Sequence, residues 1–467
     1  MNTPTDDRSG DPAPDDGQSF YAKHAKVYPR EVKGRFDRLR RTAVFALLGL
    51  FYLVPWFTWD GRQAVLFDLP ARKFWIFGLV LWPQDFIFLT WLLILLGLCL
   101  FFFTAMAGRL WCGYACPQTV WTEVFVWIEA AIEGDRAKRM KLDKAPWTAD
   151  KLVRKASKQF VWIVFSLWTG LSFVGFFAPI VPLTHSLLTL ALDGWALFWT
   201  LFYGAATYAN AGYMREQVCL YMCPYARFQS AMFDRDTLII TYDTERGEPR
   251  GARARGTDHR TKGLGDCIDC TVCVQVCPTG IDIRKGLQYE CIACSACIDA
   301  CDSVMDRVGY ERGLIRYTTE NALAGRASKI LRPRTLVYAT LLSLIFAVGL
   351  TALLTRNTVG LDVIRDRGAL YRETSHDEIE NVYFLRIINK EQHAHTYRLE
   401  VEGLEGVHLD GHSLAWRVDG GEVYSVAVRV EVPVKSMHGG HDIHFILTDA
   451  EQPSRRVREK ARFIAPP

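Results

Sequence analysis

The stretch CIDCTVCVQVCPTGIDIRKGLQYECIACSACIDAC, residues 267–301, holds eight of the thirteen cysteines of this 467-residue chain. Its first run, 267–277, has the spacing C-x2-C-x2-C-x3-C followed by proline. Its second run, 291–301, repeats the spacing with Asp302 in place of the proline. Three closely spaced thiolates on one loop hold three irons of a cubane cluster, and the fourth thiolate reaches the other cluster. The stretch therefore predicts a two-cluster module of the bacterial-ferredoxin type (α+β).

This pattern assigns the eight cysteines to two 4Fe–4S clusters. The expected ligand sets are Cys267, Cys270, Cys273 and Cys301 for one cluster, and Cys291, Cys294, Cys297 and Cys277 for the other. Zinc is the alternative, but a tetrahedral zinc site uses two C-x-x-C pairs, and four cysteines per run fit it poorly. Two clusters in a small module are typical of one-electron relay.

On both sides of this module the chain contains long runs without a charged residue. There are five, all long enough or nearly long enough to cross a bilayer, and the first is the shortest and contains Pro55. The runs are 42–59, 86–108, 160–182, 194–214 and 335–355. A buried core can explain one such run but not five. The sequence predicts a multi-domain membrane protein with five α-helical transmembrane spans.

The distribution of charge predicts how these spans are oriented. Lys and Arg are concentrated in 23–41 and 109–159, and the positive-inside rule places both segments in the cytoplasm. Counting spans then places 215–334 inside and 356–467 outside. Every cysteine falls at or before Cys301, which agrees with a reducing compartment for the module. The net charge of +4 is modest and gives no indication of nucleic acid binding.

The last part of the chain has the period-two alternation of β-strands. It is clearest in 382–388, 397–401 and 423–432, between turns rich in Gly, Asn and Asp. This predicts an all-β immunoglobulin-like sandwich, with a barrel as the alternative. The chain is expected to begin with a disordered basic cytoplasmic N-terminus without a signal peptide, 1–41, followed by spans one to four with the cytoplasmic loop 109–159, in 42–214. The cytoplasmic ferredoxin domain is expected at 215–334, with helical sequence at 320–332. Span five, 335–355, then leads to the external sandwich, 356–467.

A hexapeptide, C-x-Y-x-C-P, occurs twice, at 112–117 and 219–224. Each copy begins four or five residues beyond an uncharged run, so both are expected at the inner face of the membrane. Proline suits the first position of a helix, which places Cys116 and Cys223 at N-caps, where the helix dipole favours thiolate. The segment 117–132 that follows the first copy predicts an amphipathic helix on the membrane surface.

The two copies supply four thiols, those of Cys112, Cys116, Cys219 and Cys223. Thiolates are soft ligands suited to Cu(I), and a close pair can also be redox-active. The alternative is packing, since a buried cysteine behaves as a small hydrophobe. Repetition at equivalent positions favours a shared function, whereas Cys99, alone in the middle of a run, is expected to pack. No c-type haem motif, no histidine pair within the spans and no dinucleotide motif is found.

Eight of the eleven histidines lie in the external domain. The densest group contains Met437, His438, His441 and His444, and His393 and His395 form a second pair. Imidazole and thioether ligands can bind copper, but this spacing in a turn between strands is more typical of a solvent-facing surface. We interpret it as surface.

Four segments together resemble the CcoG family, also called FixG or RdxA. They are WCGYACPQTVW at 111–121, REQVCLYMCPYARFQ at 215–229, CVQVCPTGIDIRKGLQYECIACSACIDACDSVMD at 273–306 and GLIRYTTEN at 313–321. The resemblance implies a protein of the bacterial inner membrane with an immunoglobulin-like external domain. It further implies a role in maturing a haem–copper cytochrome oxidase, by reducing Cu(II) to Cu(I) at the catalytic cysteines of the two hexapeptides. Oxidase assembly factors or copper chaperones are the implied partners, with an unidentified electron donor.

Two other functions are compatible with the same motifs. One is a quinol-linked electron conduit of the NapH type, which requires an onward carrier outside the membrane, and the cysteine-free external domain offers none. The other is a non-enzymatic scaffold for oxidase assembly. Copper reduction by the purified protein distinguishes these alternatives from a metal reductase.

Overall fold

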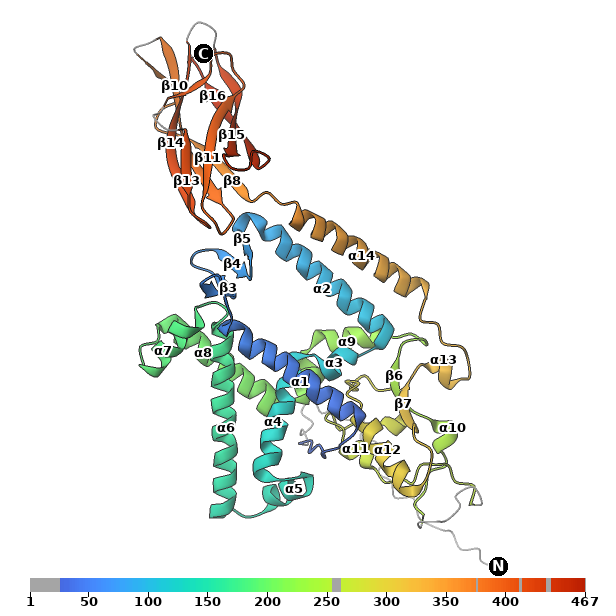
Figure 1. Cartoon of the computed structure of the whole chain (residues 1–467). Helices are drawn as coiled ribbons and strands as arrows, with labels where there is room; N and C mark the ends of the chain where they lie inside the picture. The colour runs from blue at the N-terminus through green and yellow to red at the C-terminus, as the bar shows by residue number, and fades with distance from the viewer. Residues whose placement is uncertain (1–25, 254–261, 375–376, 411–413, 434–437, 467) are drawn as a thin grey trace, which may run out of the picture.

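The computed structural model describes residues 26–253, 262–374, 377–410, 414–433 and 438–466. A ferredoxin module lies at one end of the molecule, a β-sandwich at the other, and helices connect them (Figure 1). The first 25 residues and Met437 lie outside the described ranges, so the expectations for them are not addressed by the structure.

Three helices are long and apolar enough to cross a membrane by length and composition. They span Arg35–Trp56 (α1, Arg35–Leu53, with the 3-10 turn η1, Val54–Trp56), Pro83–Ala107 (η2, Pro83–Asp85, with α2, Phe86–Ala107) and Pro333–Leu354 (α14). These helices coincide with the first, second and fifth predicted spans.

Helix α1 begins earlier than the sequence indicated. Residues 35–41, expected in a disordered segment, form its first two turns. The carboxylate of Asp299 accepts hydrogen bonds from the backbone N–H groups of Phe36 and Asp37, at 3.2 and 2.7 Å. These bonds satisfy donors that a helix N-terminus otherwise leaves unpaired. The basic stretch is therefore helical because a residue of the ferredoxin module caps it.

The third and fourth predicted spans correspond to α6 (Ala149–Val174) and to α8 (Gly194–Thr207) with the π-helix η3 (Tyr208–Met214). α6 ends eight residues before the predicted end, and a separate helix, α7 (Ile180–Leu188), follows. Gly170 allows α6 and α8 to pack closely, since a Cβ atom there would lie 2.3 Å from the Thr200 carbonyl oxygen. These helices do not meet the criteria that the other three meet, so a total of five spans stays a prediction.

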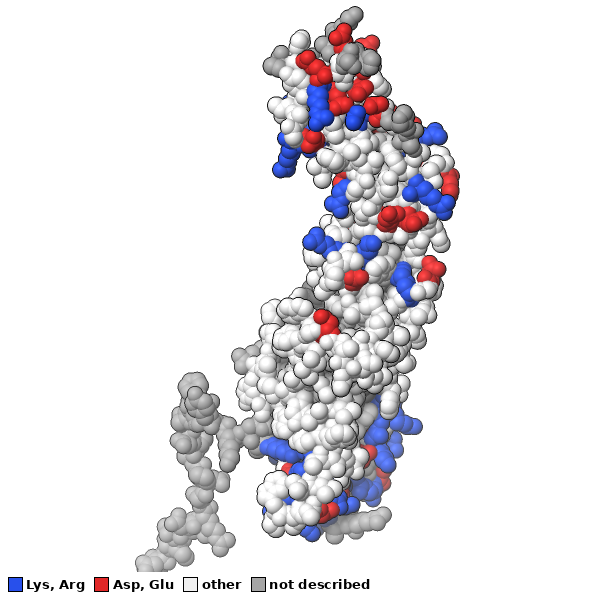
Figure 2. All heavy atoms as spheres, turned by 90° about the vertical axis from the view of Figure 1, so that its left-hand side faces the viewer, with Lys and Arg blue, Asp and Glu red and all other residues white. Residues whose placement is uncertain are grey.

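Large apolar side chains nevertheless cover the outer face of α6 and α8. Phe160, Val164, Trp195, Phe198 and Phe202 are all exposed. Figure 2 shows a broad, nearly uncharged surface between the charged groups of the sandwich and those at the opposite end. A face of this kind is typical of contact with a bilayer or a partner rather than with water.

Short helices connect the long ones on the side of the ferredoxin module. They are α3 (Leu110–Tyr114), α4 (Pro117–Glu133), α5 (Arg136–Lys144), the π-helix η4 (Val218–Met222) and α9 (Pro224–Ala231). The helix predicted for 117–132 is therefore present as α4. It packs against α6 and η3 with Phe125 fully buried beside Trp162, so it belongs to the helical bundle rather than to an isolated membrane surface.

The ferredoxin module is built around a two-stranded antiparallel sheet, β6 (Ile239–Tyr242) with β7 (Ile315–Thr318). Its helices are α10 (Thr244–Gly247), α11 (Val272–Gln275), the 3-10 turn η6 (Ile283–Lys285), α12 (Ala296–Val308) and α13 (Glu320–Leu323). Of the helical sequence expected at 320–332, only α13 forms. Leu314 and Ile315 are the most buried side chains of the module core, followed by Ile240 and Met305.

The C-terminal domain is a sandwich of two sheets, which excludes the barrel. One sheet has the order β12-β14-β10-β8, with β9 beside β10, and the other has the order β13-β11-β15-β16. The strands are β8 (Val359–Arg365), β9 (Arg372–Glu373), β10 (Glu378–Asn389), β11 (His395–Glu402), β12 (His408–Asp410), β13 (Ala415–Val418), β14 (Val423–Pro433), β15 (Gly440–Asp449) and β16 (Arg456–Ile464). Tyr383 of one sheet packs on Phe445 of the other with ring centroids 5.1 Å apart.

Two small sheets between α1 and α2 connect the sandwich to the helices. They contain β1 (Thr58–Trp59), β2 (Arg62–Gln63), β3 (Val65–Asp68), β4 (Lys73–Ile76) and β5 (Leu79–Leu81). Asp85 pairs with Lys390 at 3.1 Å and with Arg356 at 3.3 Å. α2 and α14 lie side by side (Figure 1), and the Trp91 indole N–H donates to the Ile345 carbonyl oxygen at 2.8 Å. These contacts fix the sandwich against the helices.

Candidate iron–sulfur and thiol site

The two cysteine runs fold into loops with the same backbone conformation. In both runs, the residues on either side of the second cysteine have positive φ. They are Asp269 and Thr271 in the first run, and Ala293 and Ser295 in the second. Non-glycine residues adopt this left-handed conformation rarely, and such residues cluster at functional sites. The left-handed residues on either side of this cysteine bend each loop around a small cavity.

Each loop lines its own cavity, and the cysteines divide between the cavities as the spacing predicts. One cavity is lined by Cys267, Cys270, Cys273 and Cys301. The other is lined by Cys277, Cys291, Cys294 and Cys297, with Cys273 at its edge. The fourth cysteine of each run thus crosses to the other group. All thirteen cysteines are free thiols.

The donor set of each cavity fits a 4Fe–4S cluster, because four thiols converge there without a competing disulfide. Burial and neighbouring thiols set their protonation in the metal-free chain. Burial raises the pKa of Cys291 to about 11 and that of Cys294 to about 12. Cluster binding therefore displaces protons from these cysteines. Cys270 of the first group is exposed, whereas Cys294 of the second is buried.

The two C-x-Y-x-C-P copies come together beside the second group. Cys112 lies in α3 and Cys219 in η4, while Cys116 and Cys223 are the N-cap residues of α4 and α9. Burial, and then the nearby charge of Cys116 and Cys219, raises the pKa of Cys112 to about 12. Burial, with Cys116 and Cys223, raises the pKa of Cys219 to about 11. Cys116 and Cys219 are thus within electrostatic reach of each other, and each also interacts with Cys112 or Cys223.

The helix N-terminus favours the ionised form of Cys116, but burial opposes it more strongly. Burial raises its pKa, although hydrogen bonding to the backbone N–H groups of Thr119 and Gln118 lowers it. The desolvation of a charged thiolate outweighs the favourable dipole. Without a metal ion this thiol is protonated at neutral pH.

The first copy is docked directly on the loop of the second cysteine group. Gly113 is required there, since a Cβ atom would lie 2.7 Å from the Ala293 carbonyl oxygen and 2.8 Å from that of Ile292. The hydroxyl groups of Tyr114 and Ser295 are 2.9 Å apart, and Ser295 donates to the Tyr317 hydroxyl at 2.6 Å. Cys112 packs in the same apolar group as Cys294. The tyrosine of the second copy, by contrast, is exposed.

Sequence patterns did not single out two polar residues at this site. Gln229 is fully buried, accepts a hydrogen bond from the Cys112 thiol at 3.3 Å, and donates to Thr104 at 3.4 Å. Arg109 is also buried and donates to the Ala226 carbonyl oxygen. Its charge lowers the pKa of Cys112, Cys219 and Cys291, against the larger effect of burial. The sequence contained one indication of the role of Arg109, because this residue is the first charged one after the second uncharged run and lies three positions before Cys112.

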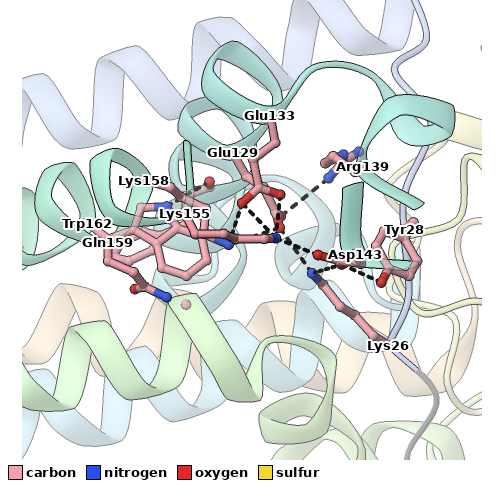
Figure 3. Close-up of polar contacts among 12 residues, drawn as sticks. Lys26, Tyr28, Glu129, Glu133, Arg139, Asp143, Lys155, Lys158, Gln159 and Trp162 are labelled. Atoms are coloured by element: carbon pink, nitrogen blue, oxygen red, sulfur yellow. Dashed lines mark hydrogen bonds and ion pairs between the residues drawn. The ribbon is translucent and has the colours of Figure 1, made fainter. Parts of the chain in front are cut away.

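A buried ionic network holds the second copy in place. Glu129 of α4 is fully buried and pairs with Arg215 at 2.8 Å, four residues before Cys219, and with Arg139 at 3.3 Å. Figure 3 shows the carboxylates of Glu129 and Glu133 facing the lysines of α6 and, on the other side, Lys26. Although burial alone would raise the pKa of Glu129, the charges of Arg215 and Lys26 lower it to about 2.

A second contact from the first copy reaches the same segment. The side-chain amide of Gln118 donates to the carbonyl oxygens of Asn210, at 2.9 Å, and Arg215, at 3.1 Å. Gln118 follows Cys116-Pro117 directly. The segment that precedes the second copy is therefore linked to α4 through both the backbone and the side chain of Arg215.

Known proteins with the same organisation identify the family. Three family models match: a 4Fe-4S dicluster domain over 214–320, a 4Fe-4S binding domain over 87–133, and the "IG-like fold at C-terminal of FixG" over 349–466. The nitrogen fixation protein FixG of Rhizobium meliloti (strain 1021) is 37% identical, covering 96% of this chain and 94% of its own. This chain belongs to the FixG/RdxA family.

Two further members of the FixG/RdxA family come from Cereibacter sphaeroides. Protein RdxA is 42% identical and protein RdxB 41% identical, each over 84% of this chain and over 85% and 86% of their own. A solved structure, that of a FixG-related protein from Vibrio parahaemolyticus, matches with 34% identity over 23% of this chain and 97% of its own, at a TM-score of 0.21. The dicluster match favours iron–sulfur clusters over zinc for the cysteine runs.

In the described part of the C-terminal domain of this FixG/RdxA member, the histidines do not form the groups that their spacing offered. His441 and His444 are three residues apart on β15, so their side chains leave opposite faces of the strand. His395 lies between Glu391 at 2.9 Å and Asp449 at 3.0 Å, as a buried ion-pairing residue. In the described part of this domain, the ligand atoms that lie within 4.8 Å of one another are those of Glu378, His408 and Glu431, on a partly exposed surface.

Proposed function

We propose that this protein is a membrane-bound iron–sulfur oxidoreductase that reduces Cu(II) to Cu(I) during the assembly of a haem–copper cytochrome oxidase. The observation that carries the proposal is the contact between the first C-x-Y-x-C-P copy and the second cysteine group. Soft thiols that bind Cu(I) well lie beside a module of one-electron carriers. Copper chaperones or oxidase assembly factors are the proposed partners.

The proposed topology places the chemistry at the cytoplasmic face of the bacterial inner membrane. The chain crosses the membrane five times, with the N-terminus and the ferredoxin module inside and the sandwich in the periplasm. The apolar faces of α6 and α8 support two spans beyond the three that length and composition indicate. The exposed Cys270 supports electron entry at the first cysteine group, which lies farther along the relay from the copper site.

Bound 4Fe–4S clusters supply one-electron transfer, held by the two cysteine groups assigned above. Cys112, Cys116, Cys219 and Cys223 provide the thiols for copper. One electron, supplied by an external one-electron donor, converts each Cu(II) to Cu(I), and each cysteine that binds the metal releases its proton. Gln229 positions the Cys112 sulfur by its hydrogen bond. The buried charge of Arg109 offsets part of the negative charge that develops on the thiolates.

The test uses the purified full-length protein in detergent, which is reduced with dithionite, freed of the excess reductant by gel filtration and then mixed with Cu(II) and a colorimetric Cu(I) chelator. The double variant Cys112→Ser/Cys219→Ser should lose Cu(I) formation while its iron content and electron paramagnetic resonance spectrum remain. Cys99→Ser, in the middle of α2, is the matched control and should behave as the wild type. Undiminished Cu(I) formation by the double variant would overturn the proposal.

A further inference from the structure

A cavity of about 390 Å³ lies between the two redox sites. Its walls are the segment 27–32, α1, α4, the segment 215–219 and the two loops at 276–279 and 292–296. It touches Cys219 of the second C-x-Y-x-C-P copy and Cys294 of the second cysteine group. Its volume is in the range of sites for small molecules.

The position of this cavity indicates which reactant it serves. Electron donors reach a relay at its accessible end, and in the first cysteine group Cys270 is exposed. The cavity instead adjoins the second group, where Cys294 is buried and Cys112 packs against it. It therefore lies on the side at which electrons leave, and its occupant is the electron acceptor.

The lining combines apolar side chains with fixed charges of both signs. Five arginines and four acidic residues contribute to it. Arg40 is held by Asp37 at 3.0 Å, and Arg41 by Glu31 at 3.0 Å. Arg41 also stacks on the face of Trp127, 5.6 Å from the ring centroid. Guanidinium groups fixed in this way present their remaining N–H donors to carboxylates in a defined geometry.

The segment 26–32, which forms one wall of the cavity, is held in place by hydrogen bonds to two other parts of the molecule. The Tyr28 hydroxyl donates to Asp143 at 2.6 Å, and Arg139 donates to the Pro29 carbonyl oxygen at 2.6 Å. The backbone N–H of Arg30 donates to the Gln275 carbonyl oxygen, at 2.8 Å, in the ferredoxin module. The segment 26–32 is thus attached on both sides, and the cavity is preformed.

We propose that this cavity binds a small, carboxylate-bearing Cu(II) complex and passes its metal to Cys219. The inference rests on the proposed function and specifies the form in which copper arrives. In the transfer step a sulfur–copper bond to Cys219 forms while a carboxylate–copper bond breaks. The released carboxylate takes the thiol proton. The copper stays Cu(II) in this exchange, and its one-electron reduction follows as described above.

The test narrows the cavity without touching a thiol or an ionic group. Ala131 is exposed and lines the cavity, whereas Ala137, on the next helix, is exposed and is not part of the lining. Ala131→Trp is the test variant and Ala137→Trp the matched control. Two quantities are measured on the purified holoprotein: the rate at which N-ethylmaleimide labels Cys219, by mass spectrometry, and KM for Cu(II)–citrate.

Ala131→Trp should slow the labelling of Cys219. It should also raise KM for Cu(II)–citrate about tenfold, which corresponds to the loss of roughly one charge-assisted hydrogen bond. Its kcat and cluster spectrum should not change, and Ala137→Trp should match the wild type. Wild-type labelling and KM in Ala131→Trp would overturn the inference and leave the proposed function standing. A wild-type protein that reduces no copper would instead refute the proposed function, and the labelling rates would still report access to Cys219. Competition by a short-chain quinol against Cu(II)–citrate would assign the cavity to a donor and also overturn the inference.

Discussion

The hydroxyl group of Tyr114 lies 2.9 Å from that of Ser295, which joins the first C-x-Y-x-C-P copy to the loop of the second cysteine group. Ser295 is fully buried between Cys294 and Cys297, and its left-handed backbone shapes that loop. A shift of either partner therefore changes the separation between the thiols of the first hexapeptide and the second cysteine group. The tyrosine of the hexapeptide has a structural role in one copy only.

Tyr114→Phe should lower the free energy of unfolding by about 1 kcal/mol, the usual net contribution of one buried hydrogen bond. Tyr221→Phe is the control, since the residue occupies the same motif position and is 70% exposed. Thermal unfolding of both variants in detergent measures the difference. Equal stability losses would show that the hydroxyl contact contributes nothing specific.

Glu129→Gln should destabilise the protein by about 3–5 kcal/mol, because it leaves buried cations without their carboxylate. The variant should also weaken copper binding, since Arg215 no longer holds the segment that leads to Cys219. Asp150→Asn removes an exposed pair with Arg154 and should cost at most about 0.5 kcal/mol. Thermal unfolding and copper titration measure the two effects. A mild phenotype for Glu129→Gln would mean that Arg215 is held by other contacts.

The same residue predicts how stability changes with pH. The pKa of Glu129 is lowered to about 2 in the folded protein, below its ordinary value near 4.5. Its contribution to stability is therefore complete above about pH 4.5 and is lost as the pH falls toward 2. Unfolding temperatures measured between pH 6 and pH 3, as an experimental range about these values, should fall less steeply in Glu129→Gln than in the wild type. Parallel curves would contradict the ionised state of this carboxylate.

Copper binding should strengthen as the pH rises. Burial raises the pKa of Cys112 to about 12 and that of Cys219 to about 11, so both thiols are protonated at neutral pH and release a proton to the metal. Each such thiol makes the Cu(I) affinity rise about tenfold per pH unit. Competition with a Cu(I) chelator at two pH values gives the slope, and Cys112→Ser should reduce it by about one proton. A flat profile would mean that the thiols are ionised before the metal binds.

Asp85→Asn should loosen the attachment of the sandwich, because one carboxylate serves both Lys390 and Arg356. Hydrogen exchange should increase in β5 and at the end of β10, while the ferredoxin module stays protected. Asp60→Asn, at the exposed turn between β1 and β2, is the control. Unchanged exchange in the first variant would show that the apolar packing of Val80 and Trp82 against Ile388 is sufficient to hold the sandwich.

The chemistry of the site was more predictable from the sequence than its surroundings. Short-range spacing fixes which thiols share a cavity, so the crossing of Cys277 and Cys301 followed from the pattern. Gln229 and Arg109 did not, because single polar residues far apart in the chain leave no periodic signal. The basic segment 109–159 was interpreted only as a topological signal, yet Arg139 and Lys158 are buried partners of Glu129. The sandwich was predictable because alternation reports two buried faces directly.

Helices α2 and α14 are joined at both of their ends. At the ferredoxin end, Arg332 donates to the Ala105 carbonyl oxygen at 2.6 Å, and at the outer end Arg356 pairs with Asp85. Together with the Trp91 contact at mid-length, these bonds make the two helices a closed frame. Tilting the sandwich relative to these helices therefore requires breaking one of these contacts. One of them is made by Ala105, four residues before Arg109. A force that tilts the C-terminal sandwich would therefore be transmitted along these helices to the segment that carries Arg109 and Cys112 at their other end.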